Sequence, residues 1–215
     1  MAGLTGFNPE EVSQSISSVI RAYEELIKAL GDDMQTQFVG GMADKWACNQ
    51  AKNFFNNAFK PAVDSLISNS NKIFESVVNA MNGGAQRWAA DTESSYSPKA
   101  FNAINKTIDT SSIAENIGGV RGIDLASANS VSAKLPTIAE SAKSALTATV
   151  QAVQNCGFIG GDQATNLSNS LNTIKNRIDS ATREITTESK QAIDKTIEVY
   201  GDTEGQVSEA FAANN

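Results

Sequence analysis

Apolar residues recur at intervals of three and four positions along most of this chain, which is the period of an amphipathic α-helix. The first stripe follows residues 8–11 (Asn-Pro-Glu-Glu), a typical helix start. There the Asn8 side chain can accept from free N–H groups, Pro9 fits the first turn, and the glutamates suit the positive helix end. The stripe comprises Val12, Ile16, Val19, Ile20, Tyr23, Leu26, Ile27 and Leu30. We predict a first helix from Pro9 that is either interrupted at Gly31 or runs on toward Phe38.

A second apolar stripe follows the break at Gly40-Gly41 and predicts a helix that begins between Ala43 and Trp46. Pro61 lies inside the stripe. Because its ring has no N–H and clashes with the preceding turn, we expect a kink or a short break there. The stripe comprises Trp46, Phe54, Phe55, Phe59, Val63, Leu66, Ile67, Ile73, Phe74, Val77, Val78, Met81 and Trp88.

The second half of the chain repeats this pattern. A third helix is predicted over residues 125–155, with a kink at Pro136, and residues 156–162 form a glycine-rich turn. The fourth helix has apolar residues at alternating spacings of four and three, which is a heptad seam typical of coiled coils and of ordinary bundles. The seam comprises Leu167, Leu171, Ile174, Ile178, Ala181 and Ile185.

Between these halves the composition changes to serine and glycine, from about Ser94 to Gly122. We interpret this stretch as a connector that contains a short helix over residues 99–108. The predicted organisation is therefore a helical hairpin over residues 1–95, a connector over 96–122, and a second helical hairpin with a C-terminal tail over 123–215.

The sequence of helix, glycine-rich turn and helix occurs twice, which suggests an internal repeat. When Trp46 is laid over Ile159, four identical pairs align: Gln50 with Gln163, Ala51 with Ala164, Asn53 with Asn166, and Asn56 with Asn169. The alternative explanation is a chance alignment of two amphipathic helix starts.

Two hairpins packed together can bury the apolar stripe that each leaves open alone. We therefore expect an all-α fold in which two long helical hairpins form a coiled-coil-like four-helix bundle. Antiparallel hairpins need a connector as long as the bundle, roughly 50 Å for helices of about 35 residues, and an extended chain covers ~3.3 Å per residue. Parallel hairpins need only a few residues, so the long connector favours the antiparallel form and leaves the parallel form open.

Charge and composition argue against several functions. The formal net charge is −7 and the sequence pI is about 4.7, and an acidic surface repels both phosphate backbones and anionic lipid headgroups. We expect no nucleic-acid partner and no membrane contact. The first residues have neither a basic region nor an apolar region, which predicts no cleavable signal peptide.

The chain also lacks the residues of common catalytic sites. It has no histidine, its two cysteines cannot form a four-ligand zinc site, and it has no phosphate-binding or dinucleotide-binding glycine motif. We predict a protein that is not an enzyme and that binds neither a metal nor another cofactor.

The turn after the first helix carries a family resemblance. It reads Gly40-Gly-Met-Ala-Asp-Lys-Trp-Ala-Cys-Asn-Gln-Ala-Lys-Asn-Phe-Phe55. This resembles the WXG superfamily, whose members are helical hairpins of about 100 residues with Trp-X-Gly in the turn, then a small residue and aromatic residues. Trp46, Ala51 and Phe54 match that pattern, and Cys48 replaces the glycine. Near the end of the chain, Tyr200 and Glu204 match the Tyr-x-x-x-Asp/Glu export signal of the same family.

The resemblance implies a secreted protein, exported without a cleavable signal peptide as a substrate of a type VII (ESX-like) secretion system. It implies the secretion-machine ATPase as a partner, with a further helical-hairpin protein as a second candidate partner. The protein would act outside the cell as a virulence effector or as a carrier for another substrate. By the same resemblance, the second hairpin stands in for the partner that family members bind.

Two other functions remain open at this stage. One is a cytoplasmic helical adaptor, and the other is a membrane-active helical toxin. The cysteines bear on the architecture: Cys48 and Cys156 both lie near turns, so antiparallel hairpins place them at opposite ends, where they cannot bond, whereas parallel hairpins bring them close. We expect free thiols.

Overall fold

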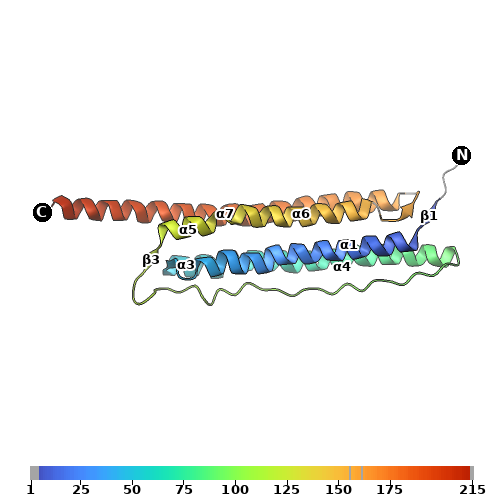
Figure 1. Cartoon of the computed structure of the whole chain (residues 1–215), viewed down its shortest axis with the longest axis horizontal. Coiled ribbons are helices and arrows are strands. Elements are labelled where there is room, and N and C mark those ends of the chain that lie inside the picture. The colour runs from blue at the N-terminus through green and yellow to red at the C-terminus, as the bar shows by residue number, and fades with distance from the viewer. Residues whose placement is uncertain (1–4, 155, 161, 214–215) are drawn as a thin grey trace.

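The computed structural model describes residues 5–154, 156–160 and 162–213, without the side chains of residues 163, 164, 204 and 207–213. Most of this chain is helical, with four long helical stretches and a few two-residue strands. The predicted all-α fold is confirmed. Figure 1 shows an elongated molecule in which the helices run along the long axis.

The first hairpin is one long helical stretch, a turn, and a second long helical stretch. The second stretch begins at Asn49, later than expected, because Trp46 and Ala47 form a strand. Pro61 causes no break: the helical backbone continues from Asn49 to Asp91, and the proline lies two residues after a π-helical segment over residues 55–59, where the hydrogen-bond pattern changes. The elements are α1 (Pro9–Ile27), the π-helix η1 (Lys28–Val39), α2 (Gly40–Met42), β2 (Trp46–Ala47), α3 (Asn49–Phe54), the π-helix η2 (Phe55–Phe59) and α4 (Lys60–Asp91).

The connector over residues 92–121 is extended, and its expected short helix over 99–108 is wrong. Main-chain groups of the connector form hydrogen bonds with side chains of the first hairpin. These bonds satisfy polar groups that a helix would otherwise pair within the segment. Figure 1 shows it running beside α1 and α4 along the length of the molecule. It ends at β3 (Gly122–Ile123).

The second hairpin consists of α5 (Leu125–Ser132), α6 (Leu135–Gln154), β4 (Phe158–Ile159) and α7 (Gln163–Ala213). The kink expected at Pro136 is a short break between α5 and α6, which places the proline in the first turn of α6. In the heptad seam of α7, Leu171 and Ile178 are buried and the other positions are half-buried.

Two pairs of short antiparallel strands join the hairpins. β1 (Gly6–Phe7) precedes α1 and pairs with β4, which lies between α6 and α7. β3 precedes α5 and pairs with β2, which lies in the turn of the first hairpin. One further main-chain hydrogen bond follows each strand pair. Asn8 N–H donates to the Gly157 carbonyl at 2.7 Å at one junction, and Asp124 N–H donates to the Lys45 carbonyl at 2.7 Å at the other. The start of each hairpin therefore meets the turn of the other.

These pairings set the register of the internal repeat. Gly6 pairs with Ile159 and Phe7 with Phe158, while Gly122 pairs with Ala47 and Ile123 with Trp46. The structural counterpart of Trp46 is therefore Phe158, one residue before the Ile159 that the sequence alignment gave. The difference arises because strand pairing, and not helix identity, fixes which residues correspond.

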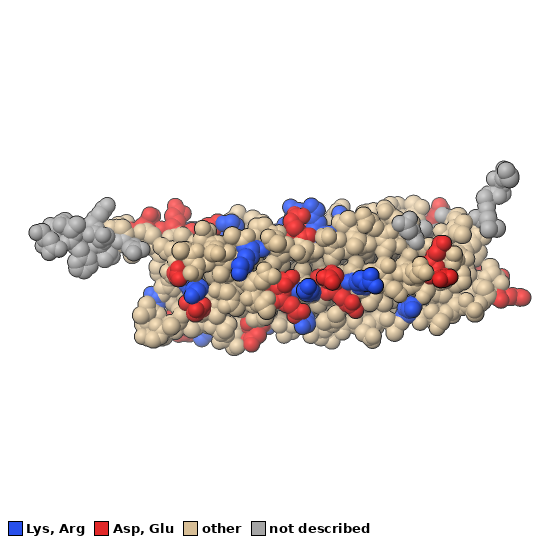
Figure 2. Space-filling view, in the orientation of Figure 1, with Lys and Arg blue, Asp and Glu red and all other residues tan. Residues whose placement is uncertain are grey.

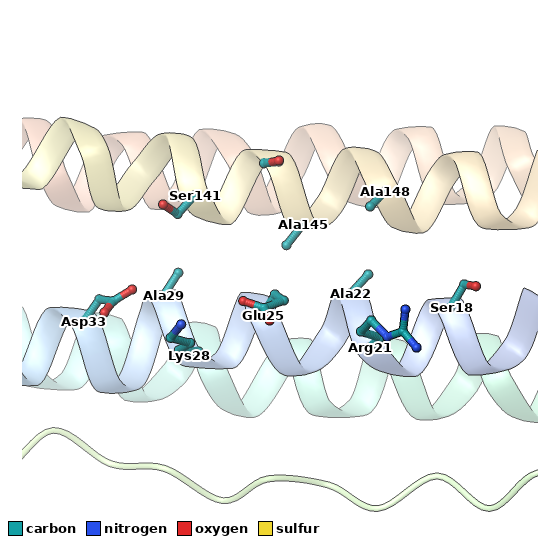
Figure 3. Close-up of a pocket in the computed structure, with 11 residues that line it drawn as sticks. Ser18, Arg21, Ala22, Glu25, Lys28, Ala29, Asp33, Ser141, Ala145 and Ala148 are labelled. Carbon is teal, nitrogen blue, oxygen red and sulfur yellow. The ribbon is translucent and has the colours of Figure 1, made fainter.

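The hairpins contact each other chiefly through α1 and α6, and α6 also packs along α7. Alanines line the contact: Figure 3 shows Ala22 of α1, Ala29 of η1, and Ala145 and Ala148 of α6 pointing into the space between the two helical stretches. Small side chains let the helices approach closely. The apolar core is continuous from one hairpin to the other, from Val12 to Ile193.

The surface carries mixed charge. Figure 2 shows acidic and basic side chains beside one another along the visible face. Arg183 of α7 illustrates the pattern, since its Nη2 lies 2.9 Å from Glu140 Oε1 of α6 and its Nε lies 3.2 Å from Asp179 Oδ1. Among the described residues, no helix is long and apolar enough to cross a membrane.

Candidate functional site at the turn of the first hairpin

The Trp46 side chain closes one end of the apolar core. Its pairing in β2 directs it inward, and it is 2 % exposed. Its ring centroid lies 5.8 Å from that of Phe54 and 6.1 Å from that of Phe55, which continue into the aromatic cluster with Phe38 and Phe59. An indole ring of this size contributes a large apolar area to the end of a bundle.

Cys48 caps the start of α3. Its backbone is extended, and it is the N-cap of α3, where its Sγ accepts a hydrogen bond from the Ala51 N–H at 3.4 Å. A side chain that accepts there satisfies one of the free N–H groups at a helix start. Ala51 is fully buried beneath the cap. The four predicted turn residues, Trp46, Cys48, Ala51 and Phe54, are thus brought together by one turn.

Tyr200 reaches the same place from the far end of the chain. A cavity of about 320 Å³ lies between α7 and the turn of the first hairpin. Burial raises the pKa of the Tyr200 phenol, and the neighbouring Cys48 side chain raises it further. The cavity is lined by Trp46, Gln50, Phe54, Ala192, Lys195, Thr196, Val199 and Tyr200. We call this set, with Cys48, the Trp46–Tyr200 site.

The backbone of α7 is helical on both sides of Tyr200 and continues through residue 204. The side chain of Glu204 lies outside the described part of the chain. Beside Tyr200, Val199 is 54 % exposed, which is unusual for a large apolar side chain in this structure. Sequence reasoning missed Val199, Gln50 and Lys195. Val199 could have been found from the sequence, because it is an apolar residue that lies outside the apolar stripe of α7.

The opposite end of the molecule provides a comparison. There Phe158 takes the place of Trp46 and borders a cavity of about 450 Å³ with Gly84, Arg87 and Leu167. Gly84 packs directly on the Phe158 ring, since a Cβ at this position would lie 3.1 Å from Phe158 Cζ. The tyrosine that shares a cavity with Trp46 thus has no counterpart among the residues that line the cavity beside Phe158.

A further cavity, of about 520 Å³, is the groove between α6 and the helical stretch of α1 and η1. Charged side chains of the first hairpin (Arg21, Glu25, Lys28 and Asp33) lie along it, and its other lining residues are serines and alanines, as Figure 3 shows. Within the described residues, no three or more Cys, Asp or Glu side chains are grouped so that they could hold a metal ion.

Comparison of the chain with models of known protein families, with curated proteins and with solved structures gives no match. The functional interpretation therefore depends on the geometry of the chain itself and on the motif residues.

Proposed function

We propose that this chain is a non-enzymatic, secreted helical protein that a type VII-like secretion system exports through the Trp46–Tyr200 site. The observation that carries the proposal is the position of Tyr200. The tyrosine of the C-terminal motif packs against the tryptophan turn of the other hairpin, although the two motifs were identified separately in the sequence. The surface around Tyr200, supported from below by the buried Trp46 turn, is then the part that the secretion-machine ATPase contacts.

The proposal includes an architecture, an antiparallel and coiled-coil-like four-helix bundle made by one chain. Three observations support it. The start of each hairpin pairs with the turn of the other, α1 contacts α6, and the core is continuous across both hairpins. In such a bundle the second hairpin occupies the place of a partner protein, so export as a single folded chain requires no further subunit.

The difference between the two ends supports a single recognition surface. Trp46 shares a cavity with Tyr200 and the exposed Val199, whereas Phe158 packs against Gly84 and is followed by Ile159, so among the described residues only the Trp46 end combines an exposed apolar side chain with a tyrosine in one cavity. An apolar side chain exposed beside a tyrosine gives a partner protein an anchor of the kind that dominates binding energy at interfaces. The secretion machine would therefore engage the molecule from the Trp46 end.

The test is export from a bacterium that carries a type VII system. The full chain is expressed in that host, and the fraction in the culture supernatant is measured against a cytoplasmic marker for lysis. We expect export of the parent chain, and loss of export in Tyr200→Ala and Trp46→Ala. Two matched controls should export normally: Phe158→Ala at the opposite end, and Thr203→Ala on the exposed face of α7.

Circular dichroism of each purified variant separates loss of a signal from loss of the fold. Retention of the parent chain in the cell would contradict export and would favour a cytoplasmic adaptor. Equal export of Tyr200→Ala and the parent would contradict the Trp46–Tyr200 site. Dye leakage from liposomes on addition of the parent chain would contradict the proposal in favour of a membrane-active protein.

A further inference from the structure

The extended connector is held on the first hairpin by an unusual set of hydrogen bonds, in which side chains bind its main chain. At Lys99, the Asn82 side-chain amide accepts from the N–H at 3.0 Å and donates to the carbonyl at 2.8 Å. A single side chain thus satisfies both main-chain groups of one connector residue. Asn82 is 7 % exposed, so these bonds are shielded from water.

The same arrangement recurs at three further connector residues. At Ile104, Tyr23 Oη accepts from the N–H at 2.5 Å and Asn71 Nδ2 donates to the carbonyl at 3.2 Å. At Ile108, Asp64 Oδ1 accepts from the N–H at 2.7 Å and Lys60 Nζ donates to the carbonyl.

At Asp109, Gln35 accepts from the N–H at 2.7 Å and donates to the carbonyl at 2.9 Å. Four positions of one extended segment therefore have both main-chain groups bound by side chains of α1, η1 and α4. Main-chain recognition of this kind is how sheet edges bind extended peptides, and here side chains take the place of a neighbouring strand.

Connector side chains add apolar contacts between these points. Phe101 packs on Tyr23 with ring centroids 4.8 Å apart, and Ile108 and Ile113 are buried. Lys106 adds one charge contact, with its Nζ 2.7 Å from Asp32 Oδ1 of η1. The groove thus binds the main chain directly, and it selects side chains at only a few places: an aromatic residue, two or three aliphatic residues, and one cation.

We propose that the groove formed by α1, η1 and α4 is a binding site for an extended peptide, and that the connector is its resident ligand. The ligand class follows from the contacts. It is an extended segment with free N–H groups at the positions of Ile104 and Ile108, apolar side chains at those of Phe101, Ile104 and Ile108, and a cation at that of Lys106. A partner segment of this pattern replaces the connector when the connector is detached.

The flanks of the connector permit a direct test with the full chain. Residues 93–95 and 115–121 are exposed, and no atom outside the neighbouring residues lies within 4 Å of a Cβ built at Gly118 or Gly119. Specific protease sites are inserted after Ser95 and between Gly118 and Gly119. After both cuts, only noncovalent contacts hold the released segment, and a fluorescent synthetic peptide of residues 96–113 is added to exchange with it.

We expect the doubly cut protein to keep its helical circular dichroism and to take up the labelled peptide, as measured by fluorescence anisotropy. Asn71→Ala combined with Asn82→Ala should weaken binding by on the order of tenfold or more, since buried hydrogen-bond partners are lost. Asn79→Ala, on the exposed face of α4, is the matched control and should bind as the parent does.

A second peptide isolates main-chain recognition. N-methylation at the positions of Ile104 and Ile108 keeps both side chains and removes the N–H groups that donate to Tyr23 and Asp64. This peptide should bind at least on the order of tenfold more weakly. The proposal is overturned if the cut protein unfolds, which would make the connector a structural part. It is equally overturned if the labelled peptide does not bind, or if the N-methylated peptide binds as well as the parent peptide.

Discussion

The Tyr23 side chain joins α1, α4 and the connector. Its hydroxyl donates to Asn71 Oδ1 of α4 at 2.8 Å and accepts from the connector N–H of Ile104 at 2.5 Å. Its ring also packs on Phe74 and Phe101, with centroids 5.2 Å and 4.8 Å away. A fully buried residue with this many partners determines how the connector lies on the hairpin.

Tyr23→Phe keeps the ring and removes the hydroxyl, which leaves a buried amide oxygen and a buried N–H without their partner. The free energy of unfolding should fall by about 1–3 kcal/mol, the usual cost of buried groups left unsatisfied. Urea denaturation followed by circular dichroism measures the change. Ser17→Ala removes a hydroxyl from the exposed face of the same helix and serves as the control. A loss no larger than that of the control would contradict the role of Tyr23.

The pKa of Tyr23 should make stability depend on alkaline pH. Burial raises the pKa of its phenol, with a smaller contribution from the charge of Glu24. A folded-state pKa above the unfolded one means that the stabilisation is complete below about pH 10, the ordinary value, and is lost as pH rises through the folded-state pKa. The parent chain should therefore lose more stability than Tyr23→Phe between about pH 9 and pH 11. Parallel declines in the two proteins would rule this out.

The two thiols should react slowly in the folded protein. Cys48 and Cys156 are free and buried, and burial raises the pKa of the Cys156 thiol, which lowers its reactive thiolate fraction. Titration with a thiol reagent at neutral pH should be slow without denaturant and should show two rapid equivalents with it. A native disulfide, with no titratable thiol in denaturant, would contradict both the buried thiols and their separation.

At the scale of elements, the amphipathic pattern predicted the helices well, because a helix is a local structure and its apolar stripe is printed in the sequence. Pro61 and Pro136 were harder to interpret. Each was expected to bend a helix, but Pro61 follows the π-helix η2 without a break in the helical stretch, and Pro136 lies in the first turn of α6. The same residue disrupts a helix interior and suits a helix start, so its effect depends on where the previous element ends.

The connector shows what the local pattern does not contain. Its residues could form a helix by composition, but its main chain bonds to Tyr23, Gln35, Asp64 and Asn82, which lie far away in the sequence. No short-range signal reports such partners. The register of the repeat was missed by one residue for a related reason, since β1–β4 and β2–β3 pairing joins distant segments.

Asn8 caps the start of α1 and Asp124 caps the start of α5 in the same way, but only the Asp124 side chain can titrate. Asp124 accepts from Ser127 N–H at 3.0 Å and from Ser127 Oγ at 2.7 Å, and these bonds lower the pKa of its carboxyl, with help from Lys45. A lowered folded-state pKa means that the stabilisation is present above about pH 4, the ordinary value, and is lost as pH falls through the folded-state pKa.

Asp124→Asn keeps a cap that accepts from Ser127 N–H and removes the titrating group, since asparagine also favours this position. The melting temperature of the variant should therefore fall less than that of the parent as pH is lowered from about 5 to about 2.5. Asn8 already provides an uncharged cap at the equivalent place in α1. Identical acid profiles for the variant and the parent would show that Asp124 makes no contribution of this kind.

At the scale of the whole molecule, the candidate site exists only because the two halves meet. The sequence predicted both the Trp46 turn and the Tyr200 motif, yet nothing in either one reports that they share a cavity. Their meeting depends on the length of α7, which extends past α5 to the turn of the first hairpin. A site of this kind follows from topology, and the direction of the second hairpin decides whether it forms.

The direction of the hairpins can be measured with two pairs of spin labels in a Cys48→Ser, Cys156→Ala background. Asp44 lies in the first turn, Asp162 in the second, and Glu10 at the start of α1. Antiparallel hairpins put labels at 44 and 162 at opposite ends of α1 and η1, roughly 40 Å apart. They put labels at 10 and 162 at one end, about 10–20 Å apart, because neighbouring helices pack 8–10 Å from axis to axis. Parallel hairpins exchange the two distances. The parallel pair of distances would place Tyr200 away from Trp46 and would contradict the Trp46–Tyr200 site. The antiparallel pair would support the geometry of the site, and the export measurement would then test its function.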